Sequence, residues 1–124
     1  MKDRGGWMAL VLCLFSGSAQ AEAGIGYKSV AEARAALTAI PGVQTSQQNG
    51  WLVVIDKASG TVWSFSPPND QAYPAVVKRQ VVQREGRAFI DMHVLCEAPK
   101  AACDRLVEDF KALNAEAGKA AGGR

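Results

Sequence analysis

The chain has 124 residues, of which 48% are hydrophobic, and its 14 basic and 12 acidic residues give a formal net charge of +2. This length suits one domain rather than several. So small an excess of positive charge, with no run of basic residues, argues against a protein that binds nucleic acid or an anionic membrane surface.

Residues 1–21 have the features of a secretory signal peptide. Two basic residues, Lys2 and Arg4, come before an apolar run from Trp7 to Phe15. Small residues then lead up to Ala21, after which we expect cleavage. The apolar run is too short to cross a membrane, which takes about 20 residues as a helix. We therefore expect a periplasmic or secreted protein with no membrane insertion after cleavage.

Removing 21 of the 124 residues leaves 103, which is enough for one domain with a modest core. We expect a flexible segment at 22–28, a single α+β domain at 29–114 and a disordered tail at 115–124. Both ends of the mature chain are poor in large apolar side chains, so packing cannot offset the entropy lost on ordering them.

The first predicted element is a helix from Val30 to Ala39 or Ile40. Ser29 and Glu32 have the spacing of a capping box, in which each side chain satisfies a free amide at the start of the helix. Pro41-Gly42 follows and ends the helix, because proline cannot continue it and glycine readily takes the left-handed exit.

Five extended segments are predicted next, and tight turns at Asn49-Gly50, Ser59-Gly60 and Glu85-Gly86 separate most of them. The segments are Val43–Gln48, Trp51–Asp56, Thr61–Ser66, Ala75–Arg84 and Arg87–Cys96. A last helix is predicted to begin at Pro99, with an apolar stripe made by Cys103, Leu106, Val107, Phe110 and Leu113.

The cysteines of the mature chain, Cys96 and Cys103, form an even pair in a small exported domain, which favours a disulfide. A redox-active pair would need Cys-x-x-Cys or another sign of an activated thiolate, and six residues separate these two. We predict a structural disulfide that ties the last strand to the last helix.

Alternation of side chains along the strands assigns one face of the sheet to the core. If the turns hold two residues, this face carries Leu52, Val54, Trp63, Phe65, Val77, Val81, Ile90, Met92, Val94 and Cys96. The predicted fold is α+β: a five-stranded antiparallel meander, with the N-terminal and C-terminal helices packed on one face and one disulfide.

The opposite face is predicted to be unusually apolar, and we expect a protein partner or a second copy of the chain to bind there. A bulge that shifts the register, or coverage by the tail or by the loop Pro67–Pro74, would also explain the pattern. The loop itself is stiffened by prolines and presents Tyr73, which either contacts a partner or seals the edge of the core. The candidate partner-binding residues are Trp51, Val53, Ile55, Tyr73, Lys78, Phe89, Asp91 and His93.

The pair Asp91 and His93 is the only candidate for chemistry. An acid-histidine pair can activate a nucleophile, but the sequence offers no Gly-x-Ser-x-Gly motif or free thiolate beside it. One histidine and no paired ligand spacing argue against a metal site. We expect no catalytic residue, no metal and no other cofactor.

Five stretches together cover most of the mature chain: Tyr27-Lys28-Ser29-Val30, Trp63-Ser64-Phe65-Ser66-Pro67-Pro68, Pro74-Ala75-Val76-Val77-Lys78-Arg79, Val94-Leu95-Cys96-Glu97-Ala98 and Cys103-Asp104. In these stretches the chain resembles a group of small exported proteins of Gram-negative bacteria that lack an established function. Some of them carry a general chaperone designation. A J-domain needs His-Pro-Asp between two helices, however, whereas His93-Val94 is predicted to lie in a strand. The resemblance implies a periplasmic location and no particular activity.

The resulting functional prediction is a small periplasmic binding or accessory protein of the cell envelope that acts through protein–protein contact. An inhibitor or immunity protein against an exported toxin or hydrolase shares export, one disulfide and a stiff loop, and it stays as the alternative. A small hydrolase is a third hypothesis, for which the sequence supplies no complete active site.

Overall fold

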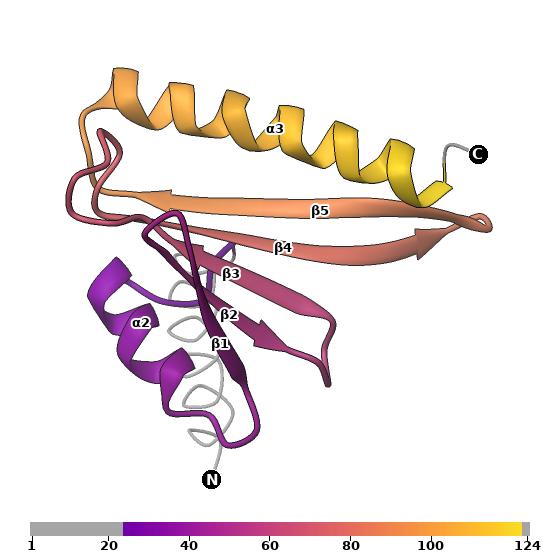
Figure 1. The fold of residues 1–124 in the computed structure, drawn as a ribbon, viewed down its shortest axis with the longest axis horizontal. Helices are drawn as coiled ribbons and strands as arrows, with labels where there is room; N and C mark the ends of the chain where they lie inside the picture. The colour runs from indigo at the N-terminus through magenta and orange to yellow at the C-terminus, as the bar shows by residue number, and fades with distance from the viewer. Residues whose placement is uncertain (1–23, 123–124) are drawn as a thin grey trace, which may run out of the picture.

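The computed structural model describes residues 24–122, and the predicted signal peptide at 1–21 lies outside them (Figure 1). In this range the chain forms two helices and a five-stranded antiparallel sheet with the strand order β1-β2-β3-β4-β5. The predicted α+β meander is therefore confirmed. In chain order the elements are α2 (Val30–Thr38), β1 (Gln44–Gln48), β2 (Trp51–Asp56), β3 (Thr61–Phe65), β4 (Ala75–Arg84), β5 (Arg87–Cys96) and α3 (Lys100–Gly122).

Local sequence signals place the hairpins and the first helix. Asn49 and Glu85 each have a positive φ, of 54° and 53°, and each is followed by a glycine that also has a positive φ. This conformation at both central residues is that of the two-residue turn that matches the twist of paired strands. At the start of α2, the side chain of Ser29 accepts a hydrogen bond from the amide of Glu32 at 3.0 Å, as the capping box predicts.

The two helices pack on opposite faces of the sheet, so the prediction that both cover one face is wrong. We call these faces the α2 face and the α3 face. Beneath α2 lie Val54, Trp63 and Phe65 in one buried cluster. Beneath α3, Leu106 and Phe110 pack with a second cluster from the other side of the sheet, which includes Ala72, Ala75, Val77 and Cys96. Figure 1 shows α3 running along the β4–β5 hairpin and α2 beside β1 and β2.

The register between β3 and β4 explains this difference. Trp63 pairs with Lys78, and Phe65 pairs with Val76, so Val77 points to the face opposite Trp63. The segment between the two strands is a long crossover rather than a two-residue turn, so no turn geometry sets their relative register. A shift of one residue moves every later side chain to the other face. The residues of the predicted core face that move to the α3 face are Val77, Val81, Ile90, Met92, Val94 and Cys96.

Both described ends of the chain are more structured than predicted. In the segment predicted to be flexible, Ile25 is buried in the cluster under α2, and the ring of Tyr27 meets Trp63 edge to face at 6.1 Å. At the other end, α3 continues to Gly122, through most of the predicted disordered tail. Alanine, glutamate and lysine are among the best helix formers, so this segment extends the helix although it has few apolar side chains to bury.

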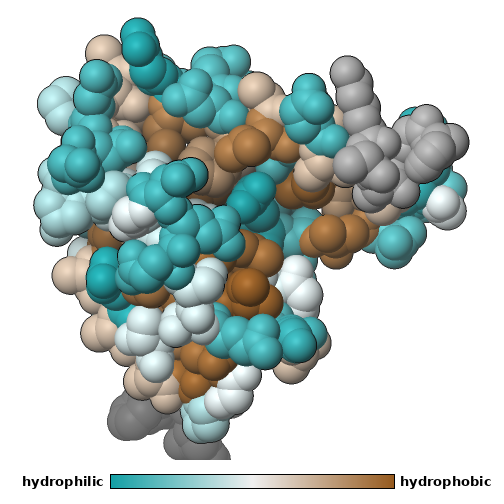
Figure 2. Space-filling view, in the orientation of Figure 1, coloured by the Kyte–Doolittle hydropathy of each residue, from teal (hydrophilic) through white to brown (hydrophobic). Residues whose placement is uncertain are grey.

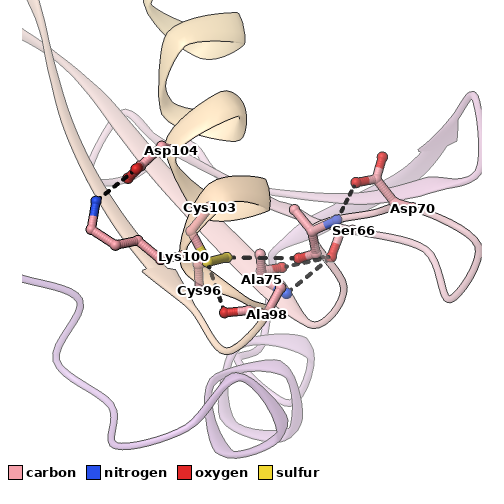
Figure 3. The surroundings of a disulfide bond; sticks show 9 residues. Ser66, Asp70, Ala75, Cys96, Ala98, Lys100, Cys103 and Asp104 are labelled. Atoms are coloured by element: carbon pink, nitrogen blue, oxygen red, sulfur yellow. Dashed lines mark hydrogen bonds and ion pairs between the residues drawn. A yellow bond between two sulfur atoms is a disulfide. The ribbon is translucent and has the colours of Figure 1, made fainter.

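The predicted disulfide is confirmed: Cys96 at the end of β5 is bonded to Cys103 in the first turn of α3, with 5.8 Å between their Cα atoms (Figure 3). Close to this bond, the exposed ammonium group of Lys100 lies 2.7 Å from Asp104, and this hydrogen bond raises the pKa of Lys100. The disulfide holds the start of α3 against the α3 face of the sheet.

Candidate interaction surface

Three of the predicted partner-binding residues lie on the α3 face of β2, where Val53 is buried and Trp51 and Ile55 are partly buried. The ring of Trp51 packs against Phe110 with 5.6 Å between the ring centres. Val53 is 7% exposed and belongs to the core. Ile55 is half-buried on the same face. Trp51 packs in the cluster under α3 and Val53 is buried, so these two side chains do not form an open surface, whereas Ile55 stays partly exposed.

Four other predicted residues share the α2 face on β4 and β5. Lys78 pairs across the strands with His93, and Phe89 pairs with Val82. Asp91 lies between them on β5, opposite Gln80. The cluster under α2 reaches only to Val76 and Leu95 in these strands, so this part of the face is half-exposed. The structure therefore brings together half of the predicted surface and separates it from the rest.

His93 and Asp91 form a partly exposed pair, with 3.3 Å between Nε2 and Oδ2 and with 42% and 43% of their side chains exposed. Among the described residues, His93 has no other hydrogen-bond partner. The backbone at Gly24 runs beside the ring, since a Cβ atom added there would lie 3.4 Å from Nδ1. The pair therefore has the carboxylate that orients a histidine, but no hydroxyl or thiol of residues 24–122 is hydrogen-bonded to the ring.

We expect the variant His93→Ala to change the free energy of unfolding by less than about 1 kcal/mol, because exposed ion pairs contribute little. Urea unfolding followed by circular dichroism measures this, with Asp91→Asn as the matched variant on the other side of the pair. A loss well above this value in both variants would show that the pair holds the segment at Gly24 in place.

Tyr73 lies in a loop that is held to the body of the protein. Asp70 stabilises the loop through its side chain, which accepts from the amide of Ala72 at 2.9 Å, and through its carbonyl, which accepts from Tyr73 at 3.1 Å. Ser66 is buried, and its Oγ accepts from the amide of Ala75 at 2.9 Å (Figure 3). The side chain of Tyr73 is 45% exposed.

A shallow depression of about 320 Å³ between this loop and α3 is lined by Asn69, Asp70, Gln71, Ala72, Ala102, Arg105, Leu106 and Asp109.

The most exposed apolar surface on the sheet lies at the end of the β4–β5 hairpin. β4 and β5 have ten residues each, whereas β3 has five and its pairing with β4 stops at Gln80. Residues 81–90, which we call the hairpin end, therefore project beyond β3. Val81 is 60% exposed on the α3 face of the hairpin, and Phe89 is 42% exposed on the α2 face. Figure 2 shows hydrophobic surface toward this side of the molecule, on the right of the view.

Two arginines flank the aromatic ring of the hairpin end. The guanidinium carbons of Arg84 and Arg87 each lie 5.8 Å from the centre of the Phe89 ring, which is within the range of a cation–π contact. The side-chain alternation predicts Phe89 on the candidate surface, but not the two arginines or Val81. The unequal strand lengths were a usable signal, because a ten-residue hairpin beside a five-residue strand must project from the sheet.

The base of the hairpin is covered by α3. Arg79 stacks on the Phe110 ring at 5.1 Å, and its burial lowers the pKa of this guanidinium group. Its Nε atom is buried and has no hydrogen-bond partner among the described residues. Leu113, one turn further along α3, is 52% exposed. The helix therefore seals the base of the hairpin and runs on beside it toward the turn (Figure 1), where Val81 and Phe89 stay exposed.

The part of the chain that the structure describes contains no cluster of three or more His, Cys, Asp or Glu side chains suited to a metal ion. Neither of the two described helices has an apolar stretch long enough to cross a bilayer. The chain matches no protein-family model, no curated protein and no solved structure.

Proposed function

We propose that this protein is a small exported accessory module of the cell envelope, which acts by contacting another protein through its hairpin end. The observation that carries the proposal is the projection of this hairpin beyond β3, with Phe89 held between Arg84 and Arg87. Arginine and large aromatic residues supply much of the binding energy at protein interfaces. Exposed apolar side chains on a projecting hairpin add little to the core, which favours a role in binding another protein.

The charges at the hairpin end favour a partner of a particular kind. Arg84 and Arg87 outnumber the single acidic residue of the turn, Glu85. A complementary surface would place carboxylates around an apolar pocket that takes the Phe89 ring, since complementary charge speeds association and selects the partner. The expected partner is therefore a protein with an acidic rim around an apolar depression.

Export is supported by two independent features. The first is the signal-peptide pattern of residues 1–21. The second is the Cys96–Cys103 disulfide, because disulfides persist in oxidising compartments such as the periplasm. Fractionation of cells that express the full chain tests the location: the mature protein is expected in the periplasmic fraction or the medium, with a mass that corresponds to cleavage after Ala21.

We expect Arg84→Glu to weaken partner binding at least about tenfold. The substitution places a carboxylate against an acidic surface and removes one of the two guanidinium groups beside the Phe89 ring. The test is chemical cross-linking in periplasm, followed by affinity measurement with each captured protein. Lys57→Glu is the matched control, since it makes the same change of charge in the turn between β2 and β3. Equal affinities of wild type, Arg84→Glu and Lys57→Glu would contradict the proposal.

An inhibitor or immunity protein is the second candidate, and the projecting shape of the hairpin favours it. A hairpin with an aromatic side chain near its end suits insertion into the concave active site of an exported toxin or hydrolase. The two functions differ in their partner. If the captured protein is an enzyme whose activity falls on addition of this protein, and Arg84→Glu relieves the inhibition, the inhibitor function replaces the accessory one.

A further inference from the structure

The outer edge of β5 is a long strand edge without a partner. β5 pairs with β4 over its full length, and no strand of the described chain pairs with its other side. The opposite edge of the sheet, β1, has only five residues, all exposed and polar. β5 has ten residues and includes Phe89, Ile90, Met92, Val94 and Leu95. Proteins usually shorten, charge or cover an edge of this kind, because it offers free amides and carbonyls to another strand.

The hairpin geometry identifies the residues whose backbone groups face this edge. A two-residue turn is closed by a hydrogen-bonded pair, which here is Arg84 and Arg87, and the direction of the backbone groups alternates along each strand. Odd-numbered residues of β5 therefore point their amide and carbonyl toward β4. The amide of Glu97 continues this pattern by donating to the carbonyl of Pro74 at 2.9 Å. The groups directed outward are those of Ala88, Ile90, Met92, Val94 and Cys96.

The sequence of β5 is complementary to itself about Met92. If a second copy of β5 runs antiparallel with Met92 opposite its own counterpart, Asp91 faces His93 of the second copy. In the same register Phe89 faces Leu95, and Arg87 faces Glu97. Each of these pairs is apolar with apolar or acidic with basic, the combinations that stabilise neighbouring strands. Centring the pairing on Asp91 or His93 instead would set two carboxylates or two imidazoles opposite each other.

The geometry points to a homodimer in which β5 pairs antiparallel with β5 of a second copy, about a two-fold axis at Met92. The outward groups of both strands then form about ten backbone hydrogen bonds, a number typical of a specific interface. The two sheets become one continuous sheet, and the β5 edge of each copy gains a partner strand. This proposal goes beyond the proposed function: both involve Arg87 and Phe89 on β5, but Arg84, whose replacement tests the proposed function, lies on β4 and takes no part in the dimer pairing.

The helix α3 packs over β5, so the proposed pairing would bring two copies of α3 side by side across the axis. The side-chain amide of Asn114 lies 3.4 Å from the sulfur of Met92, so this part of α3 is level with the proposed axis. Three of the next four residues of the helix are small, namely Ala115, Ala117 and Gly118, with the exposed Glu116 among them, and a Cβ atom added at Gly118 would meet nothing within 4 Å. Two antiparallel copies of α3 therefore approach each other at small side chains, where helix axes can come close together.

Two charge variants test the register. Asp91→Lys combined with His93→Lys makes both positions basic, and His93→Glu makes both positions acidic. Each variant alone sets like charges opposite each other across the axis, so we expect its dimer to be at least about tenfold weaker than that of the wild type. An equimolar mixture sets opposite charges across the axis and is expected to restore the dimer. Sedimentation equilibrium over a range of concentrations measures all four samples.

The mixture also separates association from folding, since each chain keeps its own internal charges whether it is mixed or not. A wild-type protein that stays monomeric, or a mixture that associates no better than its components, would overturn the proposal. Met92→Cys gives a second readout that does not change the charges. Paired Cα atoms at the axis would lie about 5.5 Å apart, within disulfide range. Oxidation should therefore link this variant into covalent dimers faster than the control Lys57→Cys, and equal rates would contradict the register.

If the wild type is monomeric and the Arg84→Glu variant still loses partner binding, only the dimer proposal is refuted. A dimer that is restored by mixing, together with partner binding that Arg84→Glu does not affect, would refute only the contact surface of the proposed function. The two proposals therefore fail separately.

Discussion

Replacing Phe65 with alanine is expected to lower the free energy of unfolding by about 3–5 kcal/mol, the range found when large core side chains are truncated. Phe65 is 1% exposed in the cluster under α2, where it packs with Val54, Trp63 and Val76. The remaining side chains are anchored in strands on one side and in α2 on the other, so they cannot close the cavity. Urea unfolding of the mature protein, followed by circular dichroism and tryptophan fluorescence, measures the loss.

Phe89→Ala is the matched control, because it makes the same chemical change at the hairpin end. Phe89 is 42% exposed and lies outside both buried clusters, so we expect a loss below about 1 kcal/mol. If the two variants lose similar stability, the hairpin end is part of the core and cannot serve as a contact surface.

Replacing both Cys96 and Cys103 with serine is expected to cost about 2.5 kcal/mol. The bond closes a loop of about eight residues, and the chain entropy that it removes from the unfolded state corresponds to this value. The same urea experiment measures it, with the wild type under a strong reductant as the internal control. Reduction should lower the stability of the wild type to nearly that of the double variant and should leave the double variant unchanged. Unequal effects would mean that the serines disturb packing under α3 as well.

The local elements of this protein could be predicted because neighbouring residues decide them. The capping box of Ser29 and Glu32 starts α2, and the positive-φ turns at Asn49-Gly50 and Glu85-Gly86 set the hairpins on either side of them. As a result, the bounds of β2, β4 and β5 agree with the sequence prediction. The cysteine pairing could also be predicted, because Cys96 and Cys103 are the only cysteines outside the predicted signal peptide.

The candidate surface was half correct for a related reason. Lys78, Phe89, Asp91 and His93 lie within one hairpin, whose register follows from its own turn, so their shared face was predictable. Val53 and its neighbours on β2 belong to the other side of the crossover between β3 and β4. Their position relative to the hairpin therefore could not be obtained from alternation alone.

The strands, the tight turns, the start of α2 and the disulfide follow from the amino-acid sequence, since each depends on residues close together in the chain or on a unique pair. How β3 pairs with β4 across residues 66–74, and thus which face each helix covers, depends instead on long-range packing. Both faces of the sheet are apolar enough to form a core, so hydrophobicity did not distinguish between them. The packing of α2 on Trp63 and Phe65, and of α3 on Val77, sets which face each helix covers. It therefore also sets which apolar side chains remain exposed.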